Sequence, residues 1–417
     1  MKIISNQPII NFYGVKSPYR ADNMLIYPIE RDITPEDISA VKKCITDDRL
    51  LGQGLNGKVY RINDEYVVKV PVQNRLTNES IMQETKKLDM LYDFSKERCI
   101  DLQNSQRGIA SVFTDSGEEY LITTYVKGTY CDKSKNRLNK HNIDSVMRIL
   151  TELDIGSKKY GRMMSYDYNG DNVNFTKKSA GLLDFEYLKG NLLEVDIPNR
   201  ILSGRKSLTP HLSDTSPLTS NVRTFEYGTL YHYLISSPPK HAAKIFRLYL
   251  NRKSLYHNKM SDYYAKRSEE GLYSDIFKEL AKREKNHSNL LNNKNLTEDI
   301  IKSEAIKIQL SEFIYRTSGS SIRGDFNPYQ IIDYYNDSVK YFKNKFREAR
   351  KSKDYNLASY YYDCMKTLDT WTYMKYVVFD ENSKSRRLFS FEKTLDAAVK
   401  NDRKLFSNLL KIFSLIK

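Results

Sequence analysis

The sequence has few cysteines and no long apolar run. Its four cysteines, at positions 44, 99, 131 and 364, show no CxxC spacing, so they indicate neither a zinc site nor a disulfide framework. No segment approaches the roughly 20 consecutive apolar residues of a membrane-spanning helix. The start MKIISNQPII also lacks an apolar block followed by a cleavage site. These absences predict a soluble protein that does not use the general secretory route.

Positive charge is concentrated in the second half of the chain. The net charge is +15, and residues 226–417 hold 35 Lys+Arg against 23 Asp+Glu, whereas residues 1–225 hold 32 against 29. Such a surface favours an acidic protein partner, an anionic membrane or, less readily, nucleic acid. A solvated helical face rich in lysine is the alternative explanation.

The first part of the chain is predicted to be an irregular leader followed by a compact mixed core. The leader covers residues 1–45 and ends in a short helix that Thr34-Pro35-Glu36-Asp37 would start. The core covers residues 46–202, and its pattern changes at residue 50 to that of short strands separated by turn residues. Five antiparallel strands and one helix are expected, namely strands at Leu50–Gly54, Lys58–Ile62, Glu65–Val70, Ile109–Thr114 and Tyr120–Val126 and a helix at 79–94.

The remainder is predicted to be mainly helical. One helix face carries Ile143, Val146, Ile149, Leu150 and Leu153, and a short hairpin is expected from strands at Val173–Phe175 and Gly181–Phe185. A loop rich in Ser, Thr and Pro follows at 203–222, and the helical region covers 223–417, with clear helices at 327–352 and 354–377 and a bend near Lys353-Asp354. The aromatic residues of these two helices are either partner anchors or core, namely Tyr360, Tyr361, Tyr362 and Trp371.

A glycine pattern lies between the first two predicted strands. Gly52, Gly54, Gly57 and Val59 form GxGxxGxV, in which glycines let backbone N–H groups approach phosphate oxygens. A glycine-rich hairpin turn without a ligand is the common alternative. A dinucleotide-binding turn is excluded, because a strand rather than a helix follows.

Lys69 lies inside an apolar strand, twelve residues past Gly57. A cation in a half-buried strand needs an anionic partner. Glu84 in the following helix is the expected carboxylate, with Glu79 as the second choice, and a phosphate of ATP is the expected ligand. The alternative is a lysine that buries its stem and keeps its ammonium in solvent.

Three further residues complete the chemical pattern. Asp167 and Asn172 lie five residues apart on a predicted loop, and Asp184 ends an apolar strand twelve residues later. A carboxylate and an amide at this spacing suit a substrate hydroxyl and a metal ion, and Asp184 suits Mg²⁺ that bridges two phosphates. Such residues are individually common in turns. Four motifs in this order favour phosphoryl transfer.

Residues from about 48 to 190 resemble the protein-kinase fold. The segments LLGQGLNGKVYRINDEYVVKVPV, SYDYNGDNVNF and LLDFEY are similar to bacterial effector kinases delivered by type III secretion, of the SteC-like and OspG/NleH-like kinds. The resemblance implies an α+β, bilobal core with an antiparallel β N-lobe and a reduced helical C-lobe, which the long helical C-terminal region completes. It also implies a serine/threonine kinase that uses ATP and Mg²⁺ and modifies host proteins in the host cytoplasm, with the leader as secretion signal. The positive charge of the second half favours acidic proteins among these substrates.

The resemblance also implies roles for individual residues. Gly52, Gly54, Gly57 and Val59 cover the nucleotide, Lys69 orients its phosphates beside Glu84, Asp167 is the catalytic acceptor, and Asn172 and Asp184 bind magnesium. The segment 121–128 is similar to the hinge that holds adenine through backbone groups, with Thr123 as gatekeeper and Thr124 and Val126 as contacts.

The sequence also departs from the general kinase pattern. Ser165-Tyr166 stand where His-Arg usually precede the catalytic Asp, Glu186 replaces the usual Gly after Asp-Phe, and no Ala-Pro-Glu follows. These departures put regulation by activation-loop phosphorylation in doubt. Two alternatives stay open: a kinase-fold enzyme that transfers AMP or another group, and a non-catalytic scaffold that binds a host factor.

Overall fold

The chain divides into two compact units. The computed structural model describes residues 17–54, 57–72, 81–97, 102, 104–130, 138–159, 172–183, 220–270, 274–318 and 328–365. Unit 1 comprises Met1–Thr129 and Ala180–Leu188, and unit 2 comprises Tyr130–Ser179 and Lys189–Lys417. The fold is therefore mixed α and β. The predicted bilobal core of residues 46–202 spans both units, because the chain passes from unit 1 to unit 2 after Thr129.

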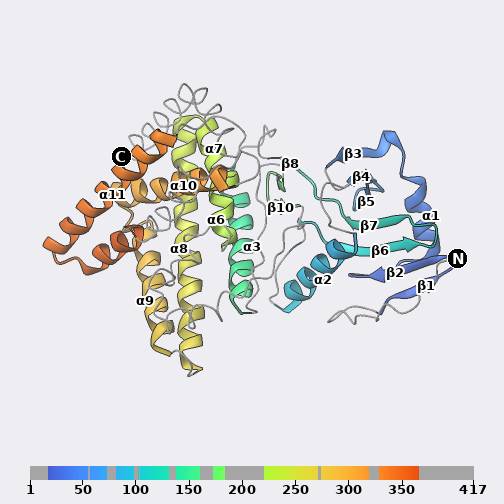
Figure 1. Cartoon of the computed structure of the whole chain (residues 1–417), viewed down its shortest axis with the longest axis horizontal. Coiled ribbons are helices and arrows are strands. Elements are labelled where there is room, and N and C mark those ends of the chain that lie inside the picture. Colours follow the sequence, from blue (N-terminus) through green and yellow to red (C-terminus); the bar gives the residue numbers. More distant parts are fainter. Residues whose placement is uncertain are drawn as a thin grey trace, which may run out of the picture. The chain divides into compact units, whose positions relative to one another are not determined.

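Unit 1 is built on a seven-stranded antiparallel sheet of order β1-β2-β6-β7-β5-β4-β3 (Figure 1). Its strands are β1 (Tyr19–Ala21), β2 (Met24–Pro28), β3 (Leu50–Gln53), β4 (Gly57–Arg61), β5 (Tyr66–Pro71), β6 (Gly108–Thr114) and β7 (Glu119–Thr124). The five predicted strands are confirmed, and their bounds differ from the predicted ones by two residues at most. Alternating apolar residues and turn signals were sufficient to locate them.

The leader is more regular than the sequence predicts. β1 and β2 form a hairpin that pairs with β6, with Ile26 opposite Val112, so the expectation of irregular structure was wrong for residues 19–28. Strands this short carry too little alternation to be recognised without their partner. The expected helix is confirmed as α1 (Pro35–Lys43), where Thr34 and Asp37 form a reciprocal capping box.

The two faces of the sheet are covered by different helices. Ile38 and Val41 of α1 join a buried cluster with Ala110 and Val112 of β6. Ser111 lies between these two strand residues, so its side chain points to the opposite face. There its hydroxyl hydrogen-bonds to Thr85 of α2 (Ile81–Glu97). The face that α2 covers is the one that carries the predicted nucleotide-binding residues.

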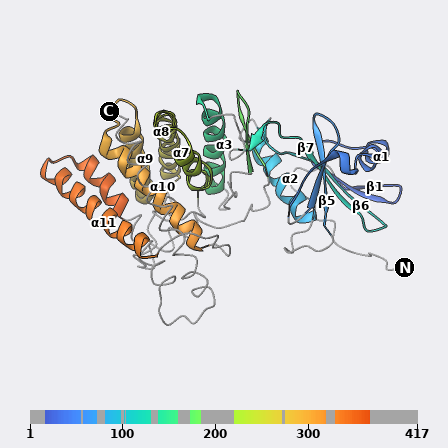
Figure 2. The same cartoon turned by 90° about the horizontal axis from the view of Figure 1, so that it is seen from above.

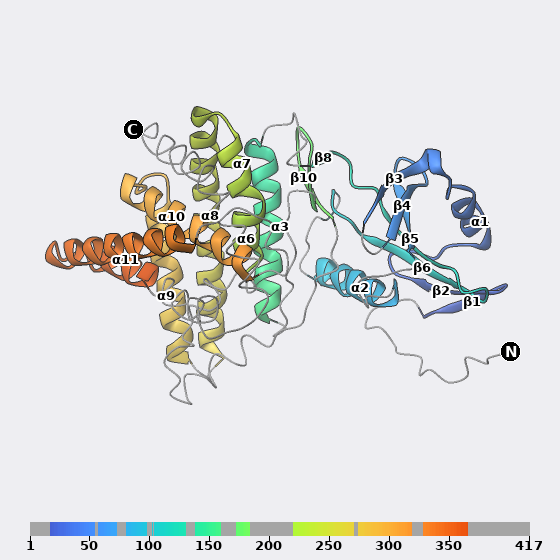
Figure 3. The same cartoon turned by 45° about the horizontal axis from the view of Figure 1, so that its top comes forward.

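Unit 2 is mainly helical. Its helices are α3 (Lys140–Lys159), α6 (Asn221–Phe225), the π-helical η5 (Glu226–Leu230), α7 (Tyr231–Ser236), α8 (Pro239–Glu269), α9 (Ser274–Leu291), α10 (Glu298–Ser318) and α11 (Pro328–Lys351). Figure 2 shows α8 and α9 side by side, and α10 runs across this pair in Figure 3. All five apolar residues predicted to share a face of α3 are buried. The prediction of a helical second half is confirmed for the described residues.

The predicted hairpin near residue 175 is also present. Strands β9 (Val173–Phe175) and β10 (Ala180–Leu182) belong to a short sheet of order β10-β9-β8, with β8 at Thr129–Tyr130. The turn after β9 is closed by the backbone N–H of Thr176, which donates to the carbonyl of Ser179 at 2.9 Å.

The aromatic residues near the end of unit 2 are mostly core. After α11 the chain bends at Lys353, whose φ is 59°, and continues as a helix over 355–365. Tyr360 and Tyr361 are buried there, whereas 45% of Tyr362 is exposed. The core alternative therefore holds for the first two, and Trp371 lies outside the described residues. Within the described ranges, every helix is too short or too polar to cross a lipid bilayer.

Candidate functional site

Lys69 and Glu84 form a shielded ion pair in unit 1. Lys69 lies on β5 opposite Val59 of β4 and Leu121 of β7, so these three side chains share one face of the sheet. The Nζ of Lys69 is 2.8 Å from Oε2 of Glu84, and their side chains are 13% and 5% exposed. The pairing predicted from the sequence is present. Glu79, the second choice, lies outside the described residues.

The three glycines differ in their surroundings. An added Cβ would meet nothing within 4 Å at Gly52 or Gly54, so the space above this turn is open. At Gly57 the same atom would lie 2.8 Å from the carbonyl oxygen of Val70 and 3.1 Å from Cγ of Lys69. Gly57 therefore leaves room for the Lys69 side chain. The N–H of Gly54 donates to the carbonyl of Gly57 at 2.9 Å and closes the turn.

The predicted hinge continues from the same sheet face. Thr123 is buried and lies opposite Val67, two residues from Lys69, so it shares the face of the ion pair. The N–H of Thr124 donates to the carbonyl of Arg107 at 3.0 Å, and its hydroxyl donates to the carbonyl of Ser105 at 3.1 Å. A contact from Thr124 to adenine would therefore use its carbonyl group. Val126 is buried beyond it.

The strand that leads to Asp184 is fixed against the same region of unit 1. The N–H of Leu182 donates to the hydroxyl of Ser105 at 3.1 Å, and the N–H of Gln106 donates to the carbonyl of Leu182 at 2.8 Å. Gly181 permits this approach, because an added Cβ would lie 2.6 Å from Val126 and only 1.7 Å from the carbonyl oxygen of Asn104. Residues 105–107 thus connect the end of β7 with β10.

The predicted residues of the transfer step are described only in part. Asp167 and Asp184 lie outside the described residues. Asn172 is half-buried directly before β9 and belongs to unit 2. The donor types of Asn172 and Asp184 suit Mg²⁺, which prefers oxygen ligands.

A second carboxyl group of α2 is electrostatically unusual. Asp89 is 4% exposed, and its Oδ1 has no hydrogen-bond partner among the described residues. Burial, with a smaller contribution from the charge of Asp93, raises the pKa of Asp89 to about 7. This helix therefore carries one carboxylate matched to a lysine, Glu84, and one, Asp89, whose Oδ1 has no hydrogen-bond partner in the part of the chain that the structure describes.

Unit 2 contains buried charges that the sequence analysis did not find. Lys253 of α8 donates to Glu226 at 2.5 Å and to Glu304 of α10 at 2.8 Å, and Lys307 donates to Glu304 at 2.8 Å. Burial opposes ionisation of Glu304, but Lys253 and Lys307 outweigh it and hold the pKa of this carboxyl well below its usual value. The two pairs of Lys253 join residues 27 and 51 positions apart, so periodicity gave no signal for them. Lys307 and Glu304 are three positions apart on one helix, but the sequence does not show that they turn inward.

A group with metal-binding chemistry lies close to these charges. His257 of α8 and Glu284 and His287 of α9 are buried and place one potential ligand atom each within 4.8 Å of the others. The Glu-x-x-His spacing of α9 was the only sequence signal for it, and the helical period explains that spacing. Neither a protein-family model nor a curated protein matches this sequence.

Proposed function

We propose that this chain is an ATP-dependent protein kinase that phosphorylates serine or threonine. The observation that carries the proposal is the ion pair of Lys69 and Glu84, on the sheet face next to an open, glycine-rich turn. A buried lysine is costly unless it is paired. Here the carboxylate holds the ammonium in place on the face where the phosphates of ATP are expected.

The nucleotide would lie along this face. Val59 and Thr123 flank the place where adenine is expected, Thr124 and Val126 supply backbone groups, and the open positions at Gly52 and Gly54 let backbone N–H groups approach phosphates. Leu182 ends the strand that precedes Asp184 and is hydrogen-bonded within unit 1. From the resemblance to kinases, Asp184 and Asn172 are the residues expected to hold Mg²⁺.

The proposed reaction moves one phosphoryl group. The hydroxyl oxygen of the substrate forms a bond to the γ-phosphorus while the bond to the β,γ-bridging oxygen breaks and ADP leaves. Asp167 would accept the hydroxyl proton, and Asp184 and Asn172 are expected to hold the Mg²⁺ that would neutralise charge on the phosphates. The resemblance to effector kinases supports a host protein as substrate and action in the host cytoplasm. The excess of Lys and Arg over Asp and Glu in residues 226–417 supports an acidic protein partner.

Phosphoryl transfer by full-length variants tests the proposal. Lys69→Met is expected to reduce transfer of labelled γ-phosphate to proteins of a host-cell extract by about 100-fold or more, since it removes a preorganised phosphate contact. Lys43→Met is the matched control, because Lys43 is an exposed lysine of α1. Asp184→Ala should have an effect as large as Lys69→Met, and circular dichroism should show unchanged helix content. Transfer by Lys69→Met at the wild-type rate would contradict the kinase proposal.

Two other outcomes identify the alternatives. Intact-mass analysis distinguishes a substrate that gains phosphate from one that gains the heavier adenylate, which would indicate AMP transfer. A scaffold would bind a host protein equally well as wild type and as Lys69→Met, and would transfer nothing in either form.

A further inference from the structure

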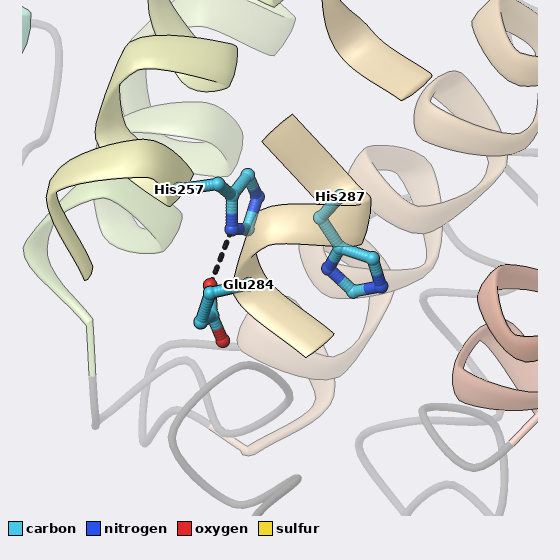
Figure 4. Close-up of side chains that lie close together, drawn as sticks. All are labelled: His257, Glu284 and His287. Carbon is cyan, nitrogen blue, oxygen red and sulfur yellow. Dashed lines mark hydrogen bonds and ion pairs between the residues drawn. The ribbon is translucent and has the colours of Figure 1, made fainter. Parts of the chain in front are cut away.

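The strongest unassigned feature of the molecule is the buried cluster of His257, Glu284 and His287 in unit 2. Figure 4 shows the carboxylate of Glu284 next to the imidazole ring of His257, with the ring of His287 to one side. His257 comes from α8, and Glu284 and His287 come from α9. Glu284 and His287 are three residues apart, so they share one face of their helix, and this face is turned toward His257. The Nδ1 of His257 is 2.6 Å from Oε2 of Glu284.

Each of the two histidines has a buried ring nitrogen without a hydrogen bond among the described residues, which is unusual for core residues. Their side chains are 4% and 5% exposed, yet the Nε2 atom of each has no hydrogen-bond partner among the described residues. Buried polar atoms nearly always have a partner, and exceptions require an explanation such as an ion or a water molecule. The hydrogen bond between His257 and Glu284 therefore does not satisfy every polar atom of the cluster.

Charged residues around the cluster hold its members in orientation. The Nη2 of Arg283 is 2.8 Å from Oε1 of Glu284, so the other carboxylate oxygen, Oε2, is the one that faces His257. Oδ2 of Asp363 lies 3.2 Å from Nε2 of His287, without hydrogen-bond geometry. In Figure 4 the other ring nitrogen of His287 is turned toward Glu284. A carboxylate beside the outer nitrogen of a histidine is the usual support of a metal-binding imidazole.

The positive charge of Lys253, close to the cluster, is balanced by carboxylates. Lys253 is bonded to both Glu226 and Glu304. A small cavity lined by His257 and His287, together with Ser220, Arg223, Lys253 and Lys307, adjoins the group. It provides space for a water molecule as a fourth ligand.

We propose that His257, Glu284 and His287 bind one divalent transition-metal ion, with zinc as the preferred ion. Two imidazoles and a carboxylate are a ligand set that zinc uses, and metal–ligand distances of about 2.0–2.1 Å place tetrahedral ligand atoms roughly 3.3 Å apart. The contact between His257 and Glu284 would open from 2.6 Å, and the more distant ligand atoms would approach. The ion would then cross-link α8 and α9 inside unit 2, independently of nucleotide binding in unit 1.

Metal binding by the full-length chain tests this proposal. Protein stripped with a chelator is titrated with Zn²⁺ by calorimetry, and with Co²⁺ by its visible absorption, whose intensity reports tetrahedral coordination. We expect about one ion per chain and a rise of the unfolding temperature with Zn²⁺. His287→Ala and Glu284→Gln should each weaken zinc binding by about 100-fold or more, since each removes a ligand or its charge. His141→Ala is the matched control, because His141 is an exposed histidine of α3.

Three results would contradict the proposed metal site, and the first of them needs only the wild-type protein. If stripped wild-type protein keeps its circular dichroism spectrum but binds neither Zn²⁺ nor Co²⁺, the site does not exist. If His141→Ala weakens binding as much as His287→Ala does, the ion is held on the surface. If folded Glu284→Gln binds zinc as tightly as wild type, the proposed ligand set is wrong.

Discussion

Asp89 shows how a single carboxyl group can make the stability of unit 1 depend on pH. It is buried on α2, and its pKa is raised from 3.8 to about 7 by burial and by the charge of Asp93. Between about pH 4 and pH 7 the folded protein therefore holds a proton that the unfolded chain has released. The free energy of unfolding falls as the pH rises through this window. The destabilisation is absent below about pH 4 and complete above about pH 7.

Asp89→Asn is expected to remove this dependence. The variant should be more stable than wild type at pH 8, by about 1 kcal/mol or more, and should differ little from it at pH 3.5. Urea unfolding at both pH values measures the effect. Asp48→Asn, at an exposed position, is the control and should change stability equally at both pH values. A variant less stable than wild type at pH 8 would show that the charged form of Asp89 is needed.

Alanine substitutions at Gly57 and at Gly54 are expected to affect stability differently, although both residues belong to the glycine pattern. A Cβ at Gly57 would crowd the carbonyl of Val70 and the side chain of Lys69, whereas a Cβ at Gly54 would enter open space. Gly57→Ala should therefore destabilise the protein by about 1–3 kcal/mol. It should also weaken nucleotide binding, because Lys69 must move. Gly54→Ala should leave the unfolding temperature unchanged. Equal stability of the two variants in thermal unfolding would contradict this account of Gly57.

At the scale of elements, α10 is joined to the rest of unit 2 by charge as well as by apolar contact. The carboxylate of Glu304 accepts hydrogen bonds from Lys253, Lys307 and the hydroxyl of Tyr360, and all four side chains are buried. Removing one member of a buried ionic group leaves the others desolvated and unmatched. The position of α10 therefore depends on one side chain to an unusual degree.

Glu304→Gln is expected to cost about 3–5 kcal/mol of unfolding free energy, since Lys307 would lose its charged partner. Glu298→Gln is the matched control, because Glu298 is an exposed glutamate in the first turn of the same helix. Denaturant unfolding of both variants measures the difference. Losses of similar size in both would indicate that helix content, and not the buried charge, determines the result.

The elements of unit 1 could be predicted from sequence because their signals are local. The pairing of Lys69 with Glu84 followed from an apolar strand and the next helix, fifteen positions away. The hairpin at residues 19–28 was missed because its strands gain their apolar face only by pairing with β6. The charges and histidines of unit 2 come together from distant helices, and no local pattern records which lysine turns inward.

At the scale of the whole molecule, the last described helix is part of the core of unit 2. Phe342 of α11 and Tyr360 and Tyr361 of the helix over 355–365 are buried. We therefore expect a chain that ends at residue 326 to be insoluble or rapidly digested by protease, because it exposes the surfaces that these residues cover. This result would count against a separate docking module in residues 327–365.

Two alanine substitutions distinguish residues that stabilise the core from residues that could contact a partner in this region. Tyr360→Ala should destabilise the full-length protein by about 3–5 kcal/mol, as is usual for the loss of a large buried ring. Tyr362→Ala, at the neighbouring exposed position, should change stability by about 0.5 kcal/mol or less. Thermal unfolding provides the comparison. A partner that requires Tyr362 would be detected as lost binding by a variant of normal stability.

The division of the chain into units has a consequence for synthesis on the ribosome. Unit 1 contains residues up to Thr129 and then Ala180–Leu188, so the chain leaves it and returns after about fifty residues of unit 2. Gly181 and Leu182, which pack against Asn104 and Ser105, emerge from the exit tunnel only after α3 has been translated. The sheet can form early in translation, but the strand that leads to Asp184 can bond to residues 105 and 106 only later. A nascent chain therefore completes unit 1 only after the beginning of unit 2 has already been made.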